Sequence, residues 1–429
     1  MRVSNAALSL LLISLPAMAA NAQDLSGEVA ELRQLVAEMR EDYESRISNL
    51  EERLTQTERL ASGARRNAEV AIEAAEQTAI DLSAGSSAPN AFNPALGAVL
   101  TGHYENTDTG SSGFALGEAE INLKASVDAR FFANLTVGMH EDNGETEVGI
   151  EEAWLQTTGL PAGWSLTGGR FFSAAGYLNS FHLHSDDFVD RPLPYQEFLG
   201  GRYSVDGLQA RWVAPTSLLF ELGTELNWGG AFPATSNGES SPGAWTLFAK
   251  LGGDVGNSNS WQLGVSHIAA DAIERSTAHG HGHAHEGEAA AETFTGDSEL
   301  TVVDFVWKWA PMGNLNVRNF KIQGEYFRSS DDGLFDGSDY DGDRDGWYLQ
   351  GAWQFAPLWR VGMRYDTVEG ELDDPDRSSR RTSAMLDWSP SEFSRLRLQY
   401  TNDRVLAETD HQWYLQYIMS IGAHGAHQF

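Results

Sequence analysis

The sequence contains no cysteine among its 429 residues, which excludes disulfide bonds and thiolate metal sites. Beyond its N-terminal region it has no apolar run long enough for a membrane-spanning helix, and its mean hydropathy of −0.35 agrees with this. Basic residues are scarce, because 29 lysines and arginines stand against 61 acidic residues and give a formal net charge of −32. Such a charge argues against nucleic acid as a partner and favours cations.

The first 22 residues have the three parts of a secretory signal peptide. Arg2 supplies the positive start, residues 6–16 form a short apolar core, and residues 20–22 offer small side chains for cleavage. The apolar core is too short to span a bilayer. We therefore expect residues 1–22 to be removed and the mature chain to begin at Gln23, outside the cytoplasm.

Residues 23–80 form a second region, rich in alanine and glutamate. Its apolar residues recur at steps of four and three, with one extra four-residue step, which is a coiled-coil pattern with a stutter. The repeat is long enough to favour an intermolecular coiled coil over a lone amphipathic helix, and residues 81–93 read as a linker. The apolar positions are Leu25, Val29, Leu32, Val36, Met39, Tyr43, Ile47, Leu50 and Leu54.

Residues 94–429 predict an all-β fold, a transmembrane antiparallel barrel. Ile121 and Leu123 alternate with Glu120, Asn122 and Lys124, so one face of the strand is apolar and the other polar. The 13 Trp, 12 Tyr and 20 Phe suit interfacial girdles. We count about sixteen strands, an even number as single-chain barrels require. The further expected strands are 95–104, 130–140, 148–157, 166–177, 207–214, 217–228, 245–253, 259–269, 300–310, 318–329, 346–356, 358–368, 381–389, 394–402 and 411–429.

The last expected strand alternates from Trp413 to an aromatic end at Phe429. This pattern is typical of the closing strand of an outer-membrane barrel, which the barrel assembly machinery reads. Short connections, such as those at 127–128 and 356–357, predict the periplasmic end, and the longer polar connections between them predict the extracellular end.

Three short stretches resemble the outer-membrane porins of Gram-negative bacteria, and more loosely the phosphate-selective porin-like group. They are residues 168–172 (Gly-Gly-Arg-Phe-Phe), 191–194 (Arg-Pro-Leu-Pro) and 206–209 (Asp-Gly-Leu-Gln). The resemblance implies that the third extracellular loop, residues 179–205, folds into the lumen. In that group lumenal lysines capture the anion, whereas this chain has only Lys124, Lys250, Lys308 and Lys321.

The third loop carries the residues that we expect at the constriction. An H-x-H pair with nearby carboxylates offers nitrogen and oxygen ligands suited to Zn²⁺, Ni²⁺ or Cu²⁺. The alternative is a set of ordinary polar residues in a hydrated opening. The residues are His182, His184, Asp186, Asp187 and Asp190.

Four arginines alternate with apolar residues on two expected strands and should therefore face the pore. They are Arg360, Arg364, Arg395 and Arg397. If they face the acidic third loop, they create a transverse field across the opening. The alternative is that they pair with lumenal carboxylates such as Asp366 and Asp387, and they also keep anion passage open as a rival function.

Three further groups suggest metal binding. Alternating histidines with glycine and alanine between them predict a flexible loop that binds metal at many weak sites. The alternative is a low-complexity, solvated loop that binds no metal. Two histidines near the C-terminus lie in residues 423–429, a stretch similar to the end of zinc-linked outer-membrane proteins. At the periplasmic rim of the barrel they would mark an exit for the ion. The residues are His279, His281, His283, His285, Glu286 and Glu288 in the loop, and His424 and His427 at the end.

A weak calcium candidate is the D-x-D-x-D-G stretch of Asp341, Asp343 and Asp345. The glutamate expected at the twelfth position is replaced by Ala352, so an acidic hairpin tip is the favoured interpretation.

The sequence thus predicts a homotrimeric outer-membrane porin with a periplasmic coiled coil, since porins are commonly trimeric. Small hydrophilic solutes would pass by diffusion, with a preference for divalent cations such as Zn²⁺, and no cofactor is required. No nucleophile and histidine stand at a spacing that indicates an enzyme. The alternatives are a general or anion-preferring porin, and a structural protein that tethers the envelope through its coil.

Overall fold

The computed structural model describes residues 94–110, 112–142, 145–228, 233, 242–276, 293–370, 378–405 and 409–422. The predicted signal peptide, coiled coil and linker lie outside the described residues. Among the residues described, no helix is long and apolar enough to cross a membrane.

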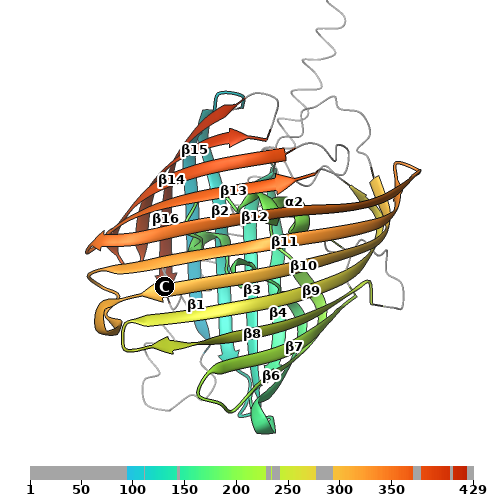
Figure 1. Cartoon of the computed structure of the whole chain (residues 1–429). Helices are drawn as coiled ribbons and strands as arrows, with labels where there is room; N and C mark the ends of the chain where they lie inside the picture. The colour runs from blue at the N-terminus through green and yellow to red at the C-terminus, as the bar shows by residue number, and fades with distance from the viewer. Residues whose placement is uncertain are drawn as a thin grey trace, which may run out of the picture. The chain divides into compact units, whose positions relative to one another are not determined.

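The described residues form a closed barrel of sixteen antiparallel strands, in which each strand pairs with its neighbours in the chain and β16 pairs with β1 (Figure 1). The predicted all-β barrel and its strand number are confirmed. The strands are β1 Ala95–Asn106, β2 Ser112–Ser126, β3 Phe131–Asp142, β4 Glu145–Thr157, β5 Trp164–Phe172, β6 Ser204–Val213, β7 Leu219–Asn227, β8 Ala244–Val255, β9 Asn259–Ser276, β10 Thr293–Trp309, β11 Asn319–Phe335, β12 Ser338–Ala356, β13 Trp359–Glu369, β14 Ser378–Ser391, β15 Ser394–Arg404 and β16 Asp410–Gly422.

Alternation along each strand separates an apolar outside from a polar inside. On β15, Leu396 and Leu398 are 40% and 43% exposed, whereas Arg397 between them is 1% exposed. Exposed aromatic pairs lie at two levels of the outer surface, with Trp359 and Trp388 stacked 6.1 Å apart at one level. Trp347 and Tyr365 lie 5.3 Å apart at the other. This surface matches the apolar band and flanking aromatic girdles of a barrel embedded in lipid.

Several strands begin earlier or end later than expected, and two of these differences change the connections that follow. β5 ends at Phe172 instead of residue 177, because the chain there turns into the barrel. β9 to β12 run further than expected, and β11 and β12 join at Asp336 and Gly337, whose φ angles are 46° and 78°. Two residues with positive φ make the tight turn that a two-residue hairpin requires, so the long polar loop expected here is absent.

The same extension places Asp341, Asp343 and Asp345 within β12. Alternate residues of an extended strand are spaced along one face, so they do not wrap their oxygens around one ion as a calcium loop does. Asp343 forms an exposed ion pair of 2.7 Å with Arg328 of β11 instead.

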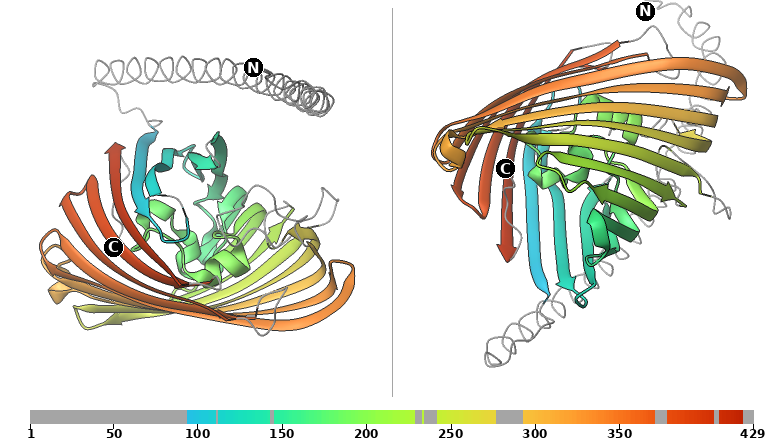
Figure 2. Two further views of the ribbon diagram at one scale, coloured as in Figure 1. Left: turned by 90° about the horizontal axis from the view of Figure 1, so that it is seen from above. Right: turned by 60° about the horizontal axis from the view of Figure 1, so that its bottom comes forward.

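The connection between β5 and β6, residues 173–203, is named L3 here. Viewed down the barrel, L3 lies inside the ring of strands (Figure 2). It contains the short 3-10 turns η2 Leu178–Ser180 and η3 Leu183–Ser185, and the helix α2 Leu193–Leu199. The main hydrophobic cluster of the described chain is therefore inside the barrel, where L3 packs against the lumenal face of the strands.

An arginine in the apolar band should destabilise the barrel. Met363 is 66% exposed on β13, between the two aromatic levels. We expect Met363→Arg to lower the free energy of unfolding by about 2–4 kcal/mol in phospholipid vesicles, the cost of a cation at mid-bilayer depth. Leu334→Arg, near the β11–β12 turn, is the control and should cost far less. Equal costs for both variants in a denaturant titration would contradict a lipid-facing band.

Candidate functional site

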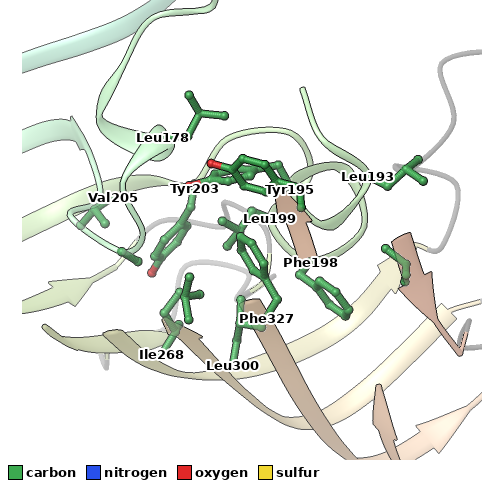
Figure 3. Close-up of a cluster of buried hydrophobic side chains, with 14 of the residues drawn as sticks. Leu178, Leu193, Tyr195, Phe198, Leu199, Tyr203, Val205, Ile268, Leu300 and Phe327 are labelled. Carbon is green, nitrogen blue, oxygen red and sulfur yellow. The ribbon is translucent and has the colours of Figure 1, made fainter. Parts of the chain in front are cut away.

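Helix α2 of L3 is the apolar anchor of the loop. Pro192 precedes the helix as its N-cap, and Gly200 ends it in the left-handed conformation with a φ of 59°. Figure 3 shows Phe198 and Leu199 directed towards Phe327 of β11. Phe198 and Phe327 stack with their ring centroids 6.0 Å apart. This packing fixes the C-terminal half of L3 on β11 to β13.

A buried carboxylate next to this anchor holds the start of L3. Glu325 of β11 accepts hydrogen bonds from the backbone N–H groups of Tyr177 and Leu178, at 3.1 and 2.9 Å. The hydroxyl groups of Tyr195 and Tyr348 also donate to it, at 3.0 and 2.6 Å. The four donors satisfy the carboxylate, so it can remain buried without a cation next to it.

The acidic part of L3 contacts the arginine-bearing wall of β13 to β15. Asp187 pairs with Arg360 at 3.0 Å and also with Lys321. Asp190 accepts hydrogen bonds from Arg364 at 2.6 Å and from Arg381 at 2.8 Å. Burial raises the pKa of Asp190, but these two arginines outweigh it and hold the pKa at about 2. Both aspartates are therefore charged, and they clamp L3 to this wall.

The remaining arginines pair with the wall itself. Arg397 donates to Asp387 of β14 at 2.9 Å and to the backbone oxygen of Asp186 at 2.8 Å. Arg395 lies 3.8 Å from the same Asp387 carboxylate. The arginines line the lumen, as alternation predicts. They touch the acidic loop and the wall carboxylates directly, and do not face the loop across an opening, so this pairing replaces the expected transverse field.

The Asp186 carboxylate contacts an arginine within L3 and not the histidines. Its carboxylate pairs with Arg191 at 2.7 Å. Burial raises the pKa of Asp186 to about 6, although Arg191 lowers it. The three aspartates of the loop thus contact basic residues, and none of their carboxylates joins the H-x-H pair.

The histidines of L3 contact a different part of the wall, formed by β2 and β4. His182 Nδ1 lies 3.0 Å from Glu120 Oε1, and its Nε2 lies 2.9 Å from Glu152 Oε2. His184 Nδ1 lies 3.3 Å from the same Glu120 oxygen. Glu118 and Glu151 complete this group, which we call the His–Glu cluster: Glu118, Glu120, Glu151, Glu152, His182 and His184.

A β-bulge brings two consecutive glutamates to the same side of β4. The register with β3 shifts, so that Thr136 opposes Glu152 while Val137 opposes Ile150. The extra residue, Glu151, is thereby turned into the lumen beside Glu152. Gly138 on β3 makes this possible, because a side chain there would occupy the space of the Glu151 carboxylate.

The His–Glu cluster stabilises positive charge. Burial lowers the pKa of His182, but its hydrogen bonds with Glu120, Glu151 and Glu152 outweigh burial and raise the pKa well above the ordinary value. Burial and the carboxylates act on His184 in the same opposed way, and its pKa is also raised. The cluster therefore holds either protons or another cation.

The structure thus divides the residues predicted for the constriction. His182 and His184 meet one wall, whereas Asp186, Asp187 and Asp190 meet basic residues elsewhere. The four glutamates of the His–Glu cluster were not predicted as site residues. Alternation alone could have placed Glu118 and Glu120 in the lumen, but not beside the histidines. The predicted metal ligands of residues 279–288, together with His424 and His427, lie outside the described residues.

No family model matches this sequence. An uncharacterised protein of Aquifex aeolicus (strain VF5) is 31% identical over 365 residues, which cover 78% of this chain and 74% of that protein.

Several solved structures share the fold at low identity. A loop-deletion mutant of OmpT, an outer-membrane protein of Vibrio cholerae, superposes with a TM-score of 0.53 at 12% identity, covering 77% of this chain and 100% of that one. The outer-membrane channel DcaP of Acinetobacter baumannii gives 0.51 at 11% identity, covering 79% and 99%. An anion-selective porin from Comamonas acidovorans gives 0.51 at 10%, covering 77% and 100%. These similarities show the porin fold.

Removing the charge that holds L3 to β13 and β14 should destabilise the protein. Asp190→Ala leaves Arg364 and Arg381, both buried, without one of their carboxylate partners. We expect a loss of about 3–5 kcal/mol, the usual cost of breaking a buried ion pair from one side. The measurement is the free energy of unfolding by guanidinium chloride in detergent.

The matched control is Asp343→Ala, which removes the exposed ion pair with Arg328. Solvent and salt screen that pair, so the control should leave the unfolding midpoint nearly unchanged. Equal effects of the two substitutions would show that Asp190 does not clamp the loop.

Proposed function

This chain belongs to the family of the Aquifex aeolicus protein, and from its closed sixteen-stranded barrel we propose that it is an outer-membrane porin. Small hydrophilic solutes would pass through it by diffusion. The apolar outer band and its aromatic levels support a position in the outer membrane. The solved porins and channels that share its fold support the same function.

The observation that carries the proposal is the position of L3. A connection that leaves the wall after β5, enters the lumen and is fastened to several walls narrows the barrel from within. Its contacts are ion pairs, hydrogen bonds and apolar packing, so it forms a fixed constriction and not a hanging loop. Solute size and charge would be selected there.

The charge balance inside the barrel favours cations. The arginines of β13 to β15 are engaged with Asp187, Asp190 and Asp387, so little positive charge remains to draw anions. On the wall formed by β2 and β4, four glutamates stand close together, and among the described residues Arg202 is the arginine that pairs with them, at 3.5 Å from Glu118 and 3.3 Å from Glu151. These four carboxylates outnumber that arginine, so they need further positive charge, from protons on His182 and His184 or from a cation, and this supports passage of cations.

Divalent cations such as Zn²⁺ are the cargo that we propose within this class. Imidazole nitrogen and carboxylate oxygen together suit Zn²⁺, and the described chain supplies both in the His–Glu cluster. The histidine-rich loop of residues 279–288 and the terminal His424 and His427 remain predicted capture and release points.

We also propose a trimer. The heptad pattern of residues 23–80 supports intermolecular association, and one solved form of the Vibrio cholerae OmpT is a trimer.

Ion selectivity tests the proposed function. In planar bilayers under a KCl gradient, the protein should form channels whose reversal potential shows preference for K⁺ over Cl⁻. Replacing Glu120, Glu151 and Glu152 by glutamine should reduce this preference, because it removes three lumenal charges. Glu221→Gln, a substitution of a lumenal carboxylate on β7, is the control and should change the reversal potential less. Preference for anions in the wild type would contradict cation passage, and absence of channels would contradict the porin.

Deletion of residues 23–80 tests the trimer. If the coiled coil holds the subunits together, the shortened protein should shift from trimer to monomer in analytical ultracentrifugation in detergent. Its barrel should still fold and conduct, because the described contacts that hold the barrel and L3 come from residues 94–422. An unchanged trimer would place the association in the barrel wall and contradict a trimerising coil.

A further inference from the structure

We propose that Glu120, His182 and His184 form a binding site for one divalent cation of the Zn²⁺ type inside the barrel. Glu118 and Glu151 lie beside them to complete the site. The proposal deepens the preference for divalent cations, and for its role in transport it rests on the proposed porin function. The site itself rests on the geometry of the His–Glu cluster.

The donor atoms stand at separations that suit a small ion. Zinc bonds to nitrogen and oxygen are about 2.0–2.1 Å long, so neighbouring ligand atoms of a tetrahedral site lie about 3.3 Å apart. His182 Nδ1 and His184 Nδ1 lie 3.0 and 3.3 Å from Glu120 Oε1. An oxygen that could serve as the fourth ligand is near, because Glu151 Oε2 lies 3.5 Å from His182 Nδ1 and Glu118 Oε2 lies 3.8 Å from His184 Nδ1. Only small side-chain shifts would close these atoms around one ion.

His182 is oriented as metal-bound histidines are. Both of its ring nitrogens face a carboxylate, Glu120 on one side and Glu152 on the other. A neutral imidazole has one N–H, which can be donated to Glu152 through Nε2. Nδ1 then directs a lone pair towards Glu120, and two such acceptors stay together only with a second proton or a metal cation between them. In zinc sites a metal-bound histidine usually donates its other ring N–H to a carboxylate, as His182 would to Glu152.

The second shell is itself held in place. Glu152 accepts hydrogen bonds from Trp154 Nε1 at 2.9 Å and from Asn134 Nδ2 at 3.1 Å. The rings of His182 and His184 stack with centroids 5.5 Å apart, and Phe172 packs edge-on against His182 at 4.9 Å. Because the side chains that bind the ion are already held in position, little side-chain entropy is lost when it arrives.

The buried charge of Glu120, and the strands and loop that supply the ligands, favour an ion at this place. Glu120 is 1% exposed, and its Oε2 atom has no hydrogen-bond partner among the described residues. The ligands come from β2, β4 and L3, so a bound ion would join the loop to this wall, as the arginines join it to the other. The ion would therefore sit at the constriction itself.

Zinc titration of the purified full-length protein tests the site. The other predicted zinc-binding histidines must be removed first, so the background variant carries alanine at positions 279, 281, 283, 285, 424 and 427. After metal is stripped with a chelator, isothermal titration with ZnCl₂ at neutral pH should show one Zn²⁺ per chain. Glu120→Gln and His182→Ala should each weaken binding at least tenfold. Glu152→Gln should weaken it by about tenfold to a hundredfold, as second-shell changes do.

Two controls and one spectrum make the result specific. Glu221→Gln and His267→Ala, which lie on β7 and β9, should leave zinc affinity unchanged. Co²⁺ bound to the background variant should give the intense visible bands of a four-coordinate site, and these should vanish in His182→Ala. Heat-modifiable migration in gels verifies that each barrel is folded. If Glu120→Gln does not fold, Glu152→Gln provides the comparison.

The proposal is overturned if the folded background variant takes up no zinc, or if Glu120→Gln, His182→Ala and Glu152→Gln all bind as tightly as the background. Channel recordings in chelator separate this result from the proposed function. A background variant that conducts but binds no zinc refutes the site alone, whereas a barrel that binds zinc but never conducts refutes the porin and retains the site.

Discussion

Charge buried inside a closed barrel must find an opposite charge, and this constraint accounts for most of the interior. L3 brings aspartates and histidines into the lumen, where an unpaired ion would be costly. The aspartates meet arginines on β13 and β14, and the histidines meet glutamates on β2 and β4. L3 therefore presents acidic residues to the basic wall and histidines to the acidic wall. The same contacts between L3 and the walls therefore determine both the stability of the loop and the electrostatic potential at the constriction.

The barrel could be predicted because its signal is local. A residue on a strand faces either lipid or lumen, so alternation such as Leu396, Arg397, Leu398 identifies a strand from a few neighbours. Strand ends were predicted less well. Beyond the lipid band both faces meet water, and the alternation that marks a strand fades into polar sequence. The acidic start of β12 was therefore interpreted as a loop, although the turn at Asp336 and Gly337 joins two long strands.

The candidate site could be predicted only in part, because its contacts join distant segments. The H-x-H pair was found from its spacing, and the lumenal arginines were found from alternation. Which carboxylates meet the histidines depends on how L3 crosses the lumen, and no local pattern contains this information. The pair Glu151 and Glu152 was beyond such a pattern altogether: strict alternation turns one of two consecutive residues towards lipid, and the extra residue in β4 lets both face the lumen.

The pairing of L3 with both walls also constrains the order in which the barrel can assemble. Asp187 and Asp190 belong to the first half of the barrel, yet their partners Arg360, Arg364 and Arg381 follow much later in the chain. Until β13 and β14 are added, these carboxylates need water. The loop therefore cannot complete these ion pairs inside an unfinished sheet, and it gains them only once β13 and β14 are in place. Docking of L3 is therefore a late event, which follows the addition of β13 and β14 to the barrel.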